Sequence, residues 1–278
     1  MFDRGMEIKT PAQIEIMRQA GLVVGKTLEL LRHSAAAGMT TGELNAIAHD
    51  NIRSLGATSN FLGYGAHGPA GAGGFAGVIC TSVNDEVVHG IPGARVLNDG
   101  DIISIDCGAI VDGWHGDAAI TVAIGEVPAE VCELMRVTEE SMWRGIAAAS
   151  LGGRVSDISH AIETYIQAQG NYGIIEGYTG HGIGTAMHQP PNVPNSGRPG
   201  RGPKLVKGLA LAVEPMVSLG TSDSRTLADD WTVVTDDGTW AAHFEHSFTL
   251  TDAGTWILTA PDGGEAKLKE LGVPFGGH

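Results

Sequence analysis

Two histidines lie in a stretch that is rich in glycine and proline, TGHGIGTAMHQPPNVP, which begins at Thr179. No helical or strand periodicity links His181 to His188 within it. Histidine is the side chain most used to bind metals and to move protons, and glycine lets the backbone approach a ligand closely. On this stretch alone, a surface turn with two incidental histidines is the simpler interpretation.

Two aspartates are predicted to share one face of a β-hairpin. In SIDCGAIVDGWHGDAAI, the pair Asp112-Gly113 lies between β-prone runs, a pattern typical of a two-residue turn. Counting outward from this turn places Asp106 opposite Ala119. Asp117 then lies diagonally across from Asp106 on the same face, about 7–8 Å away at the backbone. Two such carboxylates repel each other unless a cation lies between them, so the pattern favours a cation site.

Two glutamates extend this set. Glu214 ends the apolar run LAVEPM, where amphipathic alternation does not explain an acid. Glu245 in HFEHSFTL alternates with apolar residues, and ordinary solvent-facing polarity explains it equally well. Four carboxylates with one or two histidines suit Mn²⁺, Fe²⁺, Co²⁺ or Zn²⁺. They exceed the needs of a single catalytic zinc and favour two metal ions bridged by acids and by water or hydroxide.

The elements that must position these residues are predicted from caps and periodicity. Capping boxes at Thr10 and Thr40 indicate the starts of two helices. A long helix is predicted from Pro128, and a shorter one from its cap at Ser156 to Gly170. Runs of period two or short apolar runs follow each helix pair and indicate strands. This order predicts an α+β fold, a curved antiparallel sheet with helices packed on one side.

A constant offset between the two helix pairs indicates a weak internal repeat, although chance similarity between amphipathic helices is an alternative. The matched positions are Leu44, Ala48, Ile52 and Gly56 with Ile158, Ile162, Ile166 and Gly170. No linker separates the two parts. We therefore expect a single catalytic domain, 1–278, built from two related halves with internal pseudo-twofold symmetry, roughly 10–125 and 126–258.

Composition excludes several classes of function. The hydrophobic fraction of 42% is ample for a packed core, and the net charge of −15 disfavours binding to DNA or to an anionic membrane. Three widely spaced cysteines without a C-x-x-C pair suit a reducing compartment. We see neither the apolar core of a signal peptide nor a run of roughly 18 apolar residues. We expect a cytoplasmic protein.

Five motifs, taken in order, resemble the type I methionine aminopeptidases of bacterial kind, which have the pita-bread fold. They are NDEVVHGIP, GDIISIDCGAIVDGWHGDAA, TGHGIGTAMHQPP, LAVEPM and FEHSFTLT. The similarity runs from about Met6 to Leu258. It implies five metal ligands, which are Asp106, Asp117, His181, Glu214 and Glu245.

The resemblance also assigns roles within the site. It implies that Asp117 and Glu245 bridge the two metals, and that Glu214 is both a ligand and a proton shuttle. It implies that His89 and His188 contact the substrate and stabilise the tetrahedral intermediate. Solvent-facing loop histidines are the alternative for these two.

The activity implied by the resemblance is removal of the initiator methionine from peptides and nascent proteins with a small second residue. Two divalent ions, with Co, Mn, Fe(II) and Zn as candidates, would activate a hydroxide near neutral pH. Metal charge and a protonated histidine would stabilise the oxyanion. The expected partners are peptide and nascent-protein N-termini, with the ribosome as a further candidate.

A methionine-binding pocket is implied at Tyr64, Cys80 and Trp231, with Phe61 and Met187 as less certain members. Cys80 and Trp231 could equally be plain core residues. The segment GAHGPAGAGGFAG, residues 65–77, is longer and more glycine-rich than the usual link in the family, and it borders this pocket.

The sequence disfavours three alternative functions. Proline-specific peptidases such as prolidase and aminopeptidase P share the metal core but usually carry an extra N-terminal domain, and only about a hundred residues precede Asp106 here. A binding protein that has lost catalysis is disfavoured because all five ligand positions are filled. Nucleotide binding by Gly180, Gly182 and Gly184, or by GAGG, is disfavoured because neither stretch belongs to a strand–turn–helix unit.

Overall fold

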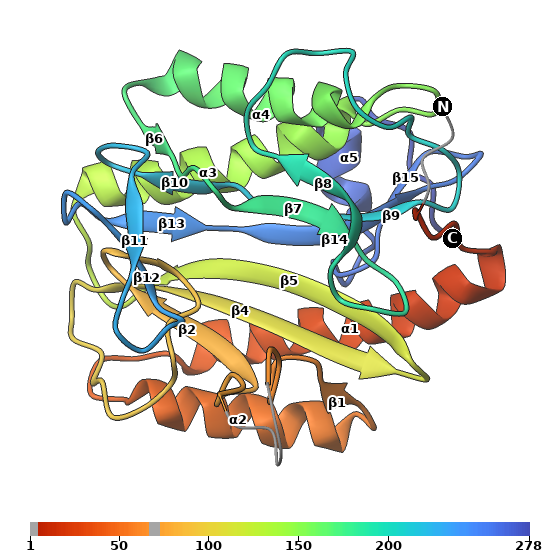
Figure 1. The fold of residues 1–278 in the computed structure, drawn as a ribbon. Coiled ribbons are helices and arrows are strands. Elements are labelled where there is room, and N and C mark those ends of the chain that lie inside the picture. The colour runs from red at the N-terminus through yellow and green to blue at the C-terminus, as the bar shows by residue number, and fades with distance from the viewer. Residues whose placement is uncertain (1–4, 67–72) are drawn as a thin grey trace.

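The computed structural model describes residues 5–66 and 73–278 (Figure 1). Its main feature is a nine-stranded sheet in the order β1-β4-β5-β14-β9-β7-β8, with β2 beside β4 and β15 beside β14. All pairings in this sheet are antiparallel. The glycine-rich segment 65–77 lies partly outside the described residues.

The strands of the large sheet are β1 (Thr58–Ser59), β2 (Ile79–Val83), β4 (Ile102–Val111), β5 (Trp114–Ala123), β7 (Thr179–Gly182), β8 (Gln189–Pro194), β9 (Ala210–Val213), β14 (Glu245–Leu250) and β15 (Thr255–Ile257). Two three-stranded sheets comprise β13 (Ala241–His243), β10 (Met216–Ser218) and β6 (Gly173–Ile174), and β11 (Ser224–Thr226), β12 (Val233–Thr235) and β3 (Glu86–Val88). The helices are α1 (Pro11–Ser34), α2 (Thr41–Ser54), α3 (Ala129–Ala148), α4 (Val155–Gln169) and α5 (Glu265–Glu270).

Capping residues fix the helix starts largely as predicted. Thr10 and Thr40 both form complete capping boxes, and Pro128 directly precedes α3. The prediction that Ser156 caps the fourth helix was wrong, since α4 begins at Val155. The Ser156 hydroxyl instead exchanges hydrogen bonds with the backbone of Arg201, so a tertiary contact uses the group that the local pattern assigned to a cap.

The hairpin of β4 and β5 has the predicted register. Val111 pairs with Trp114, and Asp106 pairs with Ala119. Asp112 has φ of 48° and Gly113 has φ of 80°, and a tight hairpin turn of this kind requires positive φ at both central residues. Because the turn fixes the register, the faces of both strands follow from it.

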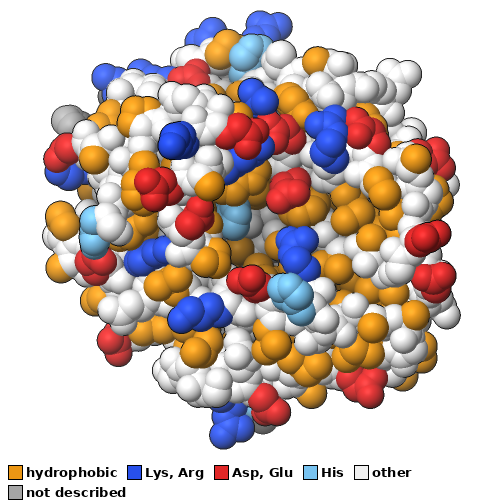
Figure 2. All heavy atoms as spheres, turned by 180° about the vertical axis from the view of Figure 1, so that it is seen from behind, with side chains coloured by type: hydrophobic (Ala, Val, Ile, Leu, Met, Phe, Trp, Pro, Cys, Tyr) orange, Lys and Arg blue, Asp and Glu red, His pale blue; other side chains and the backbone are white. Residues whose placement is uncertain are grey.

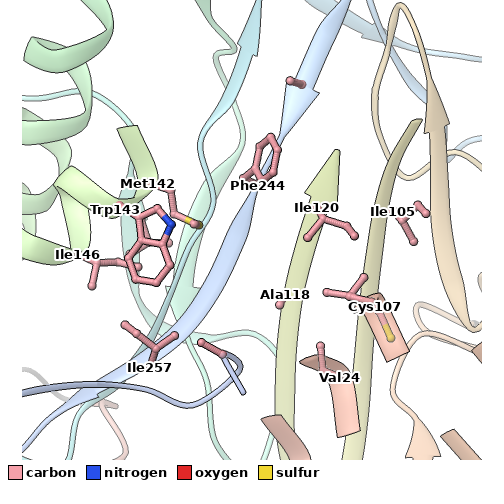
Figure 3. Packing of buried hydrophobic residues seen from close by; sticks show 14 of the residues in the cluster. Val24, Ile105, Cys107, Ala118, Ile120, Met142, Trp143, Ile146, Phe244 and Ile257 are labelled. Atoms are coloured by element: carbon pink, nitrogen blue, oxygen red, sulfur yellow. The ribbon is translucent and has the colours of Figure 1, made fainter. Parts of the chain in front are cut away.

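Two helix pairs cover the large sheet. In Figure 1, α1 and α2 lie along β4 and β5, while α3 and α4 lie beside β7, β10 and β13. Figure 3 shows Val24 of α1 close to Ala118 and Cys107 of the sheet, and Met142 and Trp143 of α3 near Ile257. The helices therefore bury one face of the strands and leave the other face to form a site.

The predicted internal repeat coincides with buried helix faces. Leu44, Ala48 and Ile52 of α2 are buried, and so are the matching isoleucines of α4. Each half contains a long helix, a shorter helix and then strands. The curved antiparallel sheet with its helical cover confirms the predicted fold class. That the chain is one catalytic domain of two halves stays a prediction.

Charge and apolar character are spread over the surface. Among the described residues, no helix combines the length and the apolar character needed to cross a membrane. On the face shown in Figure 2, acidic and basic side chains are interspersed with apolar ones, and the basic groups do not form one continuous patch.

The contact of α1 with the chain near β15 predicts a steric requirement at Gly21. A Cβ added there would overlap the carbonyl oxygen of Leu258, which is backbone and cannot rotate away. Gly21→Ala should therefore lower the free energy of unfolding by about 1–3 kcal/mol, even though alanine favours helix. Urea denaturation measures this change. Gly93→Ala is the matched control, because an added Cβ meets nothing within 4 Å there, and equal stability of the two variants would contradict the prediction.

Candidate metal and peptide site

Register brings carboxylates from separate strands into one row across the sheet. Cys80 pairs with Asp106, Asp106 with Ala119, and Ala119 with Glu245. Residues directly opposite each other in neighbouring strands project from the same face. β2, β4, β5 and β14 therefore place a thiol and two carboxylates in line on the face opposite the helices, with the small Ala119 between the acids.

A second row runs beside the first. Asp117 pairs with Gly108, and both His181 and Ser247 pair with Ala212. The Ser247 hydroxyl donates to the Asp117 carbonyl oxygen at 2.7 Å, which ties β14 to β5 at this level. Glu214 follows β9 directly. All five predicted ligands thus come from neighbouring strands or from the end of one.

The side chains of these residues converge. The side chains form three groups, and within each group the possible ligand atoms all lie within 4.8 Å of one another. The groups are Asp106, Asp117 and Glu245; His181, Glu214 and Glu245; and Asp117, His181 and His188. His181 Nε2 lies 3.3 Å from Glu214 Oε1. His181 Nδ1 lies 3.0 Å from the carbonyl oxygen of Gly182. Donation by Nδ1 to that carbonyl leaves the Nε2 lone pair free for a metal ion.

Burial makes this cluster electrostatically costly. Burial raises the pKa of Asp106 to about 7 and the pKa values of Asp117, Glu214 and Glu245 well above their usual range. Repulsion from neighbouring carboxylates adds to the rise in pKa at Asp117, Glu214 and Glu245. Glu245 is 2% exposed, so the alternative that it is ordinary solvent-facing polarity is wrong.

The donor set fits divalent cations. Within the described residues, one buried carboxylate oxygen on each of Asp106, Asp117 and Glu245 has no hydrogen-bond partner. Buried polar atoms of this kind require a compensating partner. Oxygen ligands with one imidazole match the hard and borderline divalent ions. A cation would both satisfy the orphan oxygens and remove the repulsion.

The histidines at the edge of the cluster are neutral donors. His89 follows β3 with φ of 60°, and burial lowers its pKa to about 4. Burial also lowers the pKa of His188. The Tyr64 hydroxyl lies 2.6 Å from His188 Nδ1. Both pKa shifts favour neutral imidazole at pH 7, and a protonated histidine at the oxyanion stays a prediction.

An apolar wall adjoins the carboxylates in the same pocket. Phe61, Phe75, Cys80 and Met187 form one cluster, with Ile91 and Trp231 packed against it. The pocket that these side chains share with the predicted ligands holds about 560 Å³ of empty space, including its open mouth. Tyr64, Cys80 and Trp231 therefore line the predicted pocket, and Cys80 also belongs to the apolar cluster.

Two residues of this region had no role in the sequence interpretation. Phe75 lies edge-on to Trp231, with ring centroids 5.3 Å apart, and the only local signal for it was an aromatic residue inside a glycine-rich segment. His243 is buried, its Nε2 lies 4.0 Å from Glu214 Oε2, and that nitrogen has no partner among the described residues. Its position two residues before Glu245 was the available signal.

Comparison with known proteins places this site in a family. The description of metallopeptidase family M24 matches residues 15–252. This chain belongs to family M24. It is 52% identical over 253 residues to the methionine aminopeptidase of Clostridium acetobutylicum. The aligned residues make up 91% of this chain and 98% of that protein. The resemblance drawn from the five motifs is confirmed, and this M24 protein is a metal-dependent hydrolase.

Solved structures confirm the fold. The methionine aminopeptidase of Thermotoga maritima gives a TM-score of 0.87 at 40% identity and matches 92% of this chain and 99% of that one. The prolidase of Pyrococcus furiosus gives a TM-score of 0.70 at 20% identity, with 91% of this chain matching 65% of that one. The second likeness shows the fold alone.

The buried carboxylates of this M24 site predict an unusual response to neutralisation. Asp117→Asn should keep or raise the stability of the chelator-treated protein, because it removes one repelled buried carboxylate. It should also abolish the stabilisation by Mn²⁺, which for the wild type reaches about 2.7 kcal/mol at a hundredfold excess over Kd. Thermal melts with EDTA and with Mn²⁺ measure both effects.

The control is Asp112→Asn in the turn of the same hairpin, where asparagine tolerates the left-handed backbone. It should retain the full Mn²⁺ response. An Asp117→Asn protein that Mn²⁺ still stabilises as much as the wild type would contradict this account of the cluster.

Proposed function

We propose that this protein removes the N-terminal methionine from peptides and nascent proteins whose second residue is small. The observation that carries the proposal is the juxtaposition, in one pocket, of four buried carboxylates with an apolar wall of aromatic and sulfur-bearing side chains. The first can hold metal ions and the second suits a methionine side chain. The relatives compared above are named for this activity.

The residues proposed to hold two divalent ions are Asp106, Asp117, His181, Glu214 and Glu245, with Asp117 and Glu245 as the bridging pair. Asp117, His181 and Glu245 each belong to two of the converging ligand groups, and of the three only the carboxylates offer two oxygens for two ions. Co, Mn, Fe(II) and Zn are all compatible with the donor set. Bound divalent ions would supply Lewis-acid polarisation of the scissile carbonyl and a nucleophilic water at neutral pH.

Glu214 is proposed to carry a proton between the attacking water and the leaving amine. Burial raises the pKa of its carboxyl, so the group accepts a proton readily at this position. The Asn195 side-chain amide donates to the Glu214 carbonyl oxygen at 3.1 Å and fixes the backbone there. The Glu214 carboxylate lies beside His181 and lines the pocket that a substrate would enter.

His188 and His89 are proposed to donate hydrogen bonds to the peptide carbonyl and to the oxyanion that forms from it. In the tautomer proposed here, the Tyr64 hydroxyl donates to His188 Nδ1, and the imidazole proton on Nε2 is available to a substrate oxygen. A neutral donor that is held in place in advance stabilises developing negative charge without reorganisation. The role of His89 rests on its place in the wall of the same pocket.

The methionine side chain is proposed to lie against Phe61, Phe75, Cys80 and Trp231, with Met187 beside His188. A thioether makes favourable contacts with aromatic edges, and an unbranched chain adapts to an irregular wall. The other proposed partners are nascent-protein N-termini, with the ribosome as the place where they arise. We propose a cytoplasmic location, because the cysteines Cys80, Cys107 and Cys132 are all unpaired.

Peptide hydrolysis tests the activity directly. In the presence of Mn²⁺ or Co²⁺, the protein should release methionine from Met-Ala-Ser at least about a hundredfold faster than it cleaves a matched Xaa-Pro peptide. EDTA should abolish the release. A preference for the Xaa-Pro peptide would favour a proline-specific peptidase, and no turnover with either added metal would favour a binding protein.

The role of His188 has its own test. His188→Ala should lower kcat for methionine release by about two orders of magnitude, because it removes a donor to the oxyanion. It should leave the Mn²⁺-induced rise in melting temperature intact. His160→Ala, a change at an exposed position on α4, is the control and should keep wild-type kcat. Wild-type turnover by His188→Ala would remove this residue from the proposed mechanism.

A further inference from the structure

The chain before α1 contacts the loop that carries His188. Glu7 lies about 180 residues away from this loop in sequence, yet its carboxylate accepts three hydrogen bonds from it. The donors are the Thr185 backbone N–H at 2.9 Å, the Thr185 hydroxyl at 2.8 Å and the Gln189 side-chain amide at 2.9 Å. The two donor residues flank Met187 and His188 on both sides, so one side chain fixes both ends of this short turn.

The segment that carries Glu7 is itself anchored. The Lys9 backbone N–H donates to the Gly208 carbonyl oxygen at 2.9 Å, and Ile8 forms a bridge with Leu209 just before β9. The Lys9 ammonium is 1% exposed, donates to the Glu7 carbonyl oxygen at 2.9 Å and lies 3.6 Å from the Glu7 carboxylate. The buried Lys9 ammonium therefore holds Glu7 in place.

Space around this contact is tight. A Cβ added at Gly184 would overlap Glu7 Oε2 and would lie 2.8 Å from Lys9 Nζ. The His115 backbone N–H also donates to the Gly184 carbonyl oxygen at 2.9 Å, which ties the start of the turn to β5. The loop thus fits between the Glu7–Lys9 pair and the hairpin that carries Asp117.

His188 is consequently held from two directions. Gln189, the next residue, is bound by Glu7, and the imidazole Nδ1 is bound by the Tyr64 hydroxyl. The Lys9 side chain is 1% exposed but the Glu7 side chain is 30% exposed, so this ion pair adds little net stability, and its use is to fix a geometry. This pair fixes the geometry of the turn beside the pocket.

We infer that Glu7 is a positioning residue that acts through His188: its carboxylate oxygens accept the hydrogen bonds that set the turn 185–189, so that the imidazole is held at the mouth of the carboxylate pocket. The inference rests on the proposed role of His188 as a donor to the substrate. It assigns to the N-terminal segment a function in turnover, although none of its described residues, 5–9, lines the pocket.

A double-mutant cycle tests the inference on the full chain loaded with Mn²⁺. Glu7→Ala should lower kcat for Met-Ala-Ser by about tenfold or more, with a smaller change in KM, because a misplaced catalytic group slows the chemical step. In the His188→Ala background the same change should lower kcat by less than about twofold, since the group through which it acts is gone. Glu7→Gln keeps an acceptor oxygen for Thr185 and should restore most of the lost kcat.

Two further variants separate positioning from general loss of stability. Glu43→Ala also removes hydrogen bonds that a threonine backbone N–H and hydroxyl donate to a carboxylate, at the start of α2, and it should leave kcat unchanged. Glu7→Ala combined with Lys9→Met leaves no unpaired buried charge, so it should fold while keeping the low kcat. The Mn²⁺-induced rise in melting temperature should persist in every Glu7 variant.

Each outcome decides one proposal. Equal losses of kcat from Glu7→Ala in the wild-type and His188→Ala backgrounds, or wild-type kcat in Glu7→Ala, would overturn the positioning inference and leave the proposed function standing. Wild-type kcat in His188→Ala alone would overturn the role of His188, and the inference with it. Absence of methionine release by the wild-type protein would overturn the proposed function itself.

Discussion

Four carboxylates buried on one face of an antiparallel sheet are the constraint on which the rest of this structure depends. Carboxylates at such short range and out of water cannot all stay ionised without a compensating cation. The pKa of each is raised by burial, and three buried carboxylate oxygens lack a partner within the described part of the chain. A fold that keeps this arrangement needs strands stiff enough to hold the carboxylates in place and a bound ligand that offsets their electrostatic repulsion.

The sheet meets this need by combining its register with small side chains. Gly108, Ala119 and Ala212 alternate with the ligands along the two rows and leave room between them. The opposite face of the same strands is buried against helices, as Cys107 and Ala118 show beside Val24 in Figure 3. Packing on one face therefore fixes the ligand geometry on the other, which is how a site on strands reaches higher precision than one on loops.

How well each part of the site could be predicted from the sequence depended on how far apart in the sequence the contacting residues lie. The placement of Asp106 and Asp117 on one face could be predicted because the Asp112-Gly113 turn fixes the register locally. The alternation of polar and apolar residues around Glu245 could not show which face of the sheet it lies on, because an inward-facing acid and an outward-facing acid produce the same period of two. Only its pairing with Ala119, more than a hundred residues away in sequence, decides its face, and the family resemblance had to supply that information.

The pocket residues outside the strands were harder still to predict. The apolar wall gathers side chains from segments around 61, 75, 187 and 231, and Glu7 reaches the His188 turn across most of the chain. Contacts between distant loops leave no periodic pattern in the sequence from which they could be predicted. The likeness to a prolidase at 20% identity indicates that the sheet persists as sequence diverges. The loops therefore supply most of the apolar wall, and Cys80 of β2 joins that wall to the row of carboxylates on the sheet.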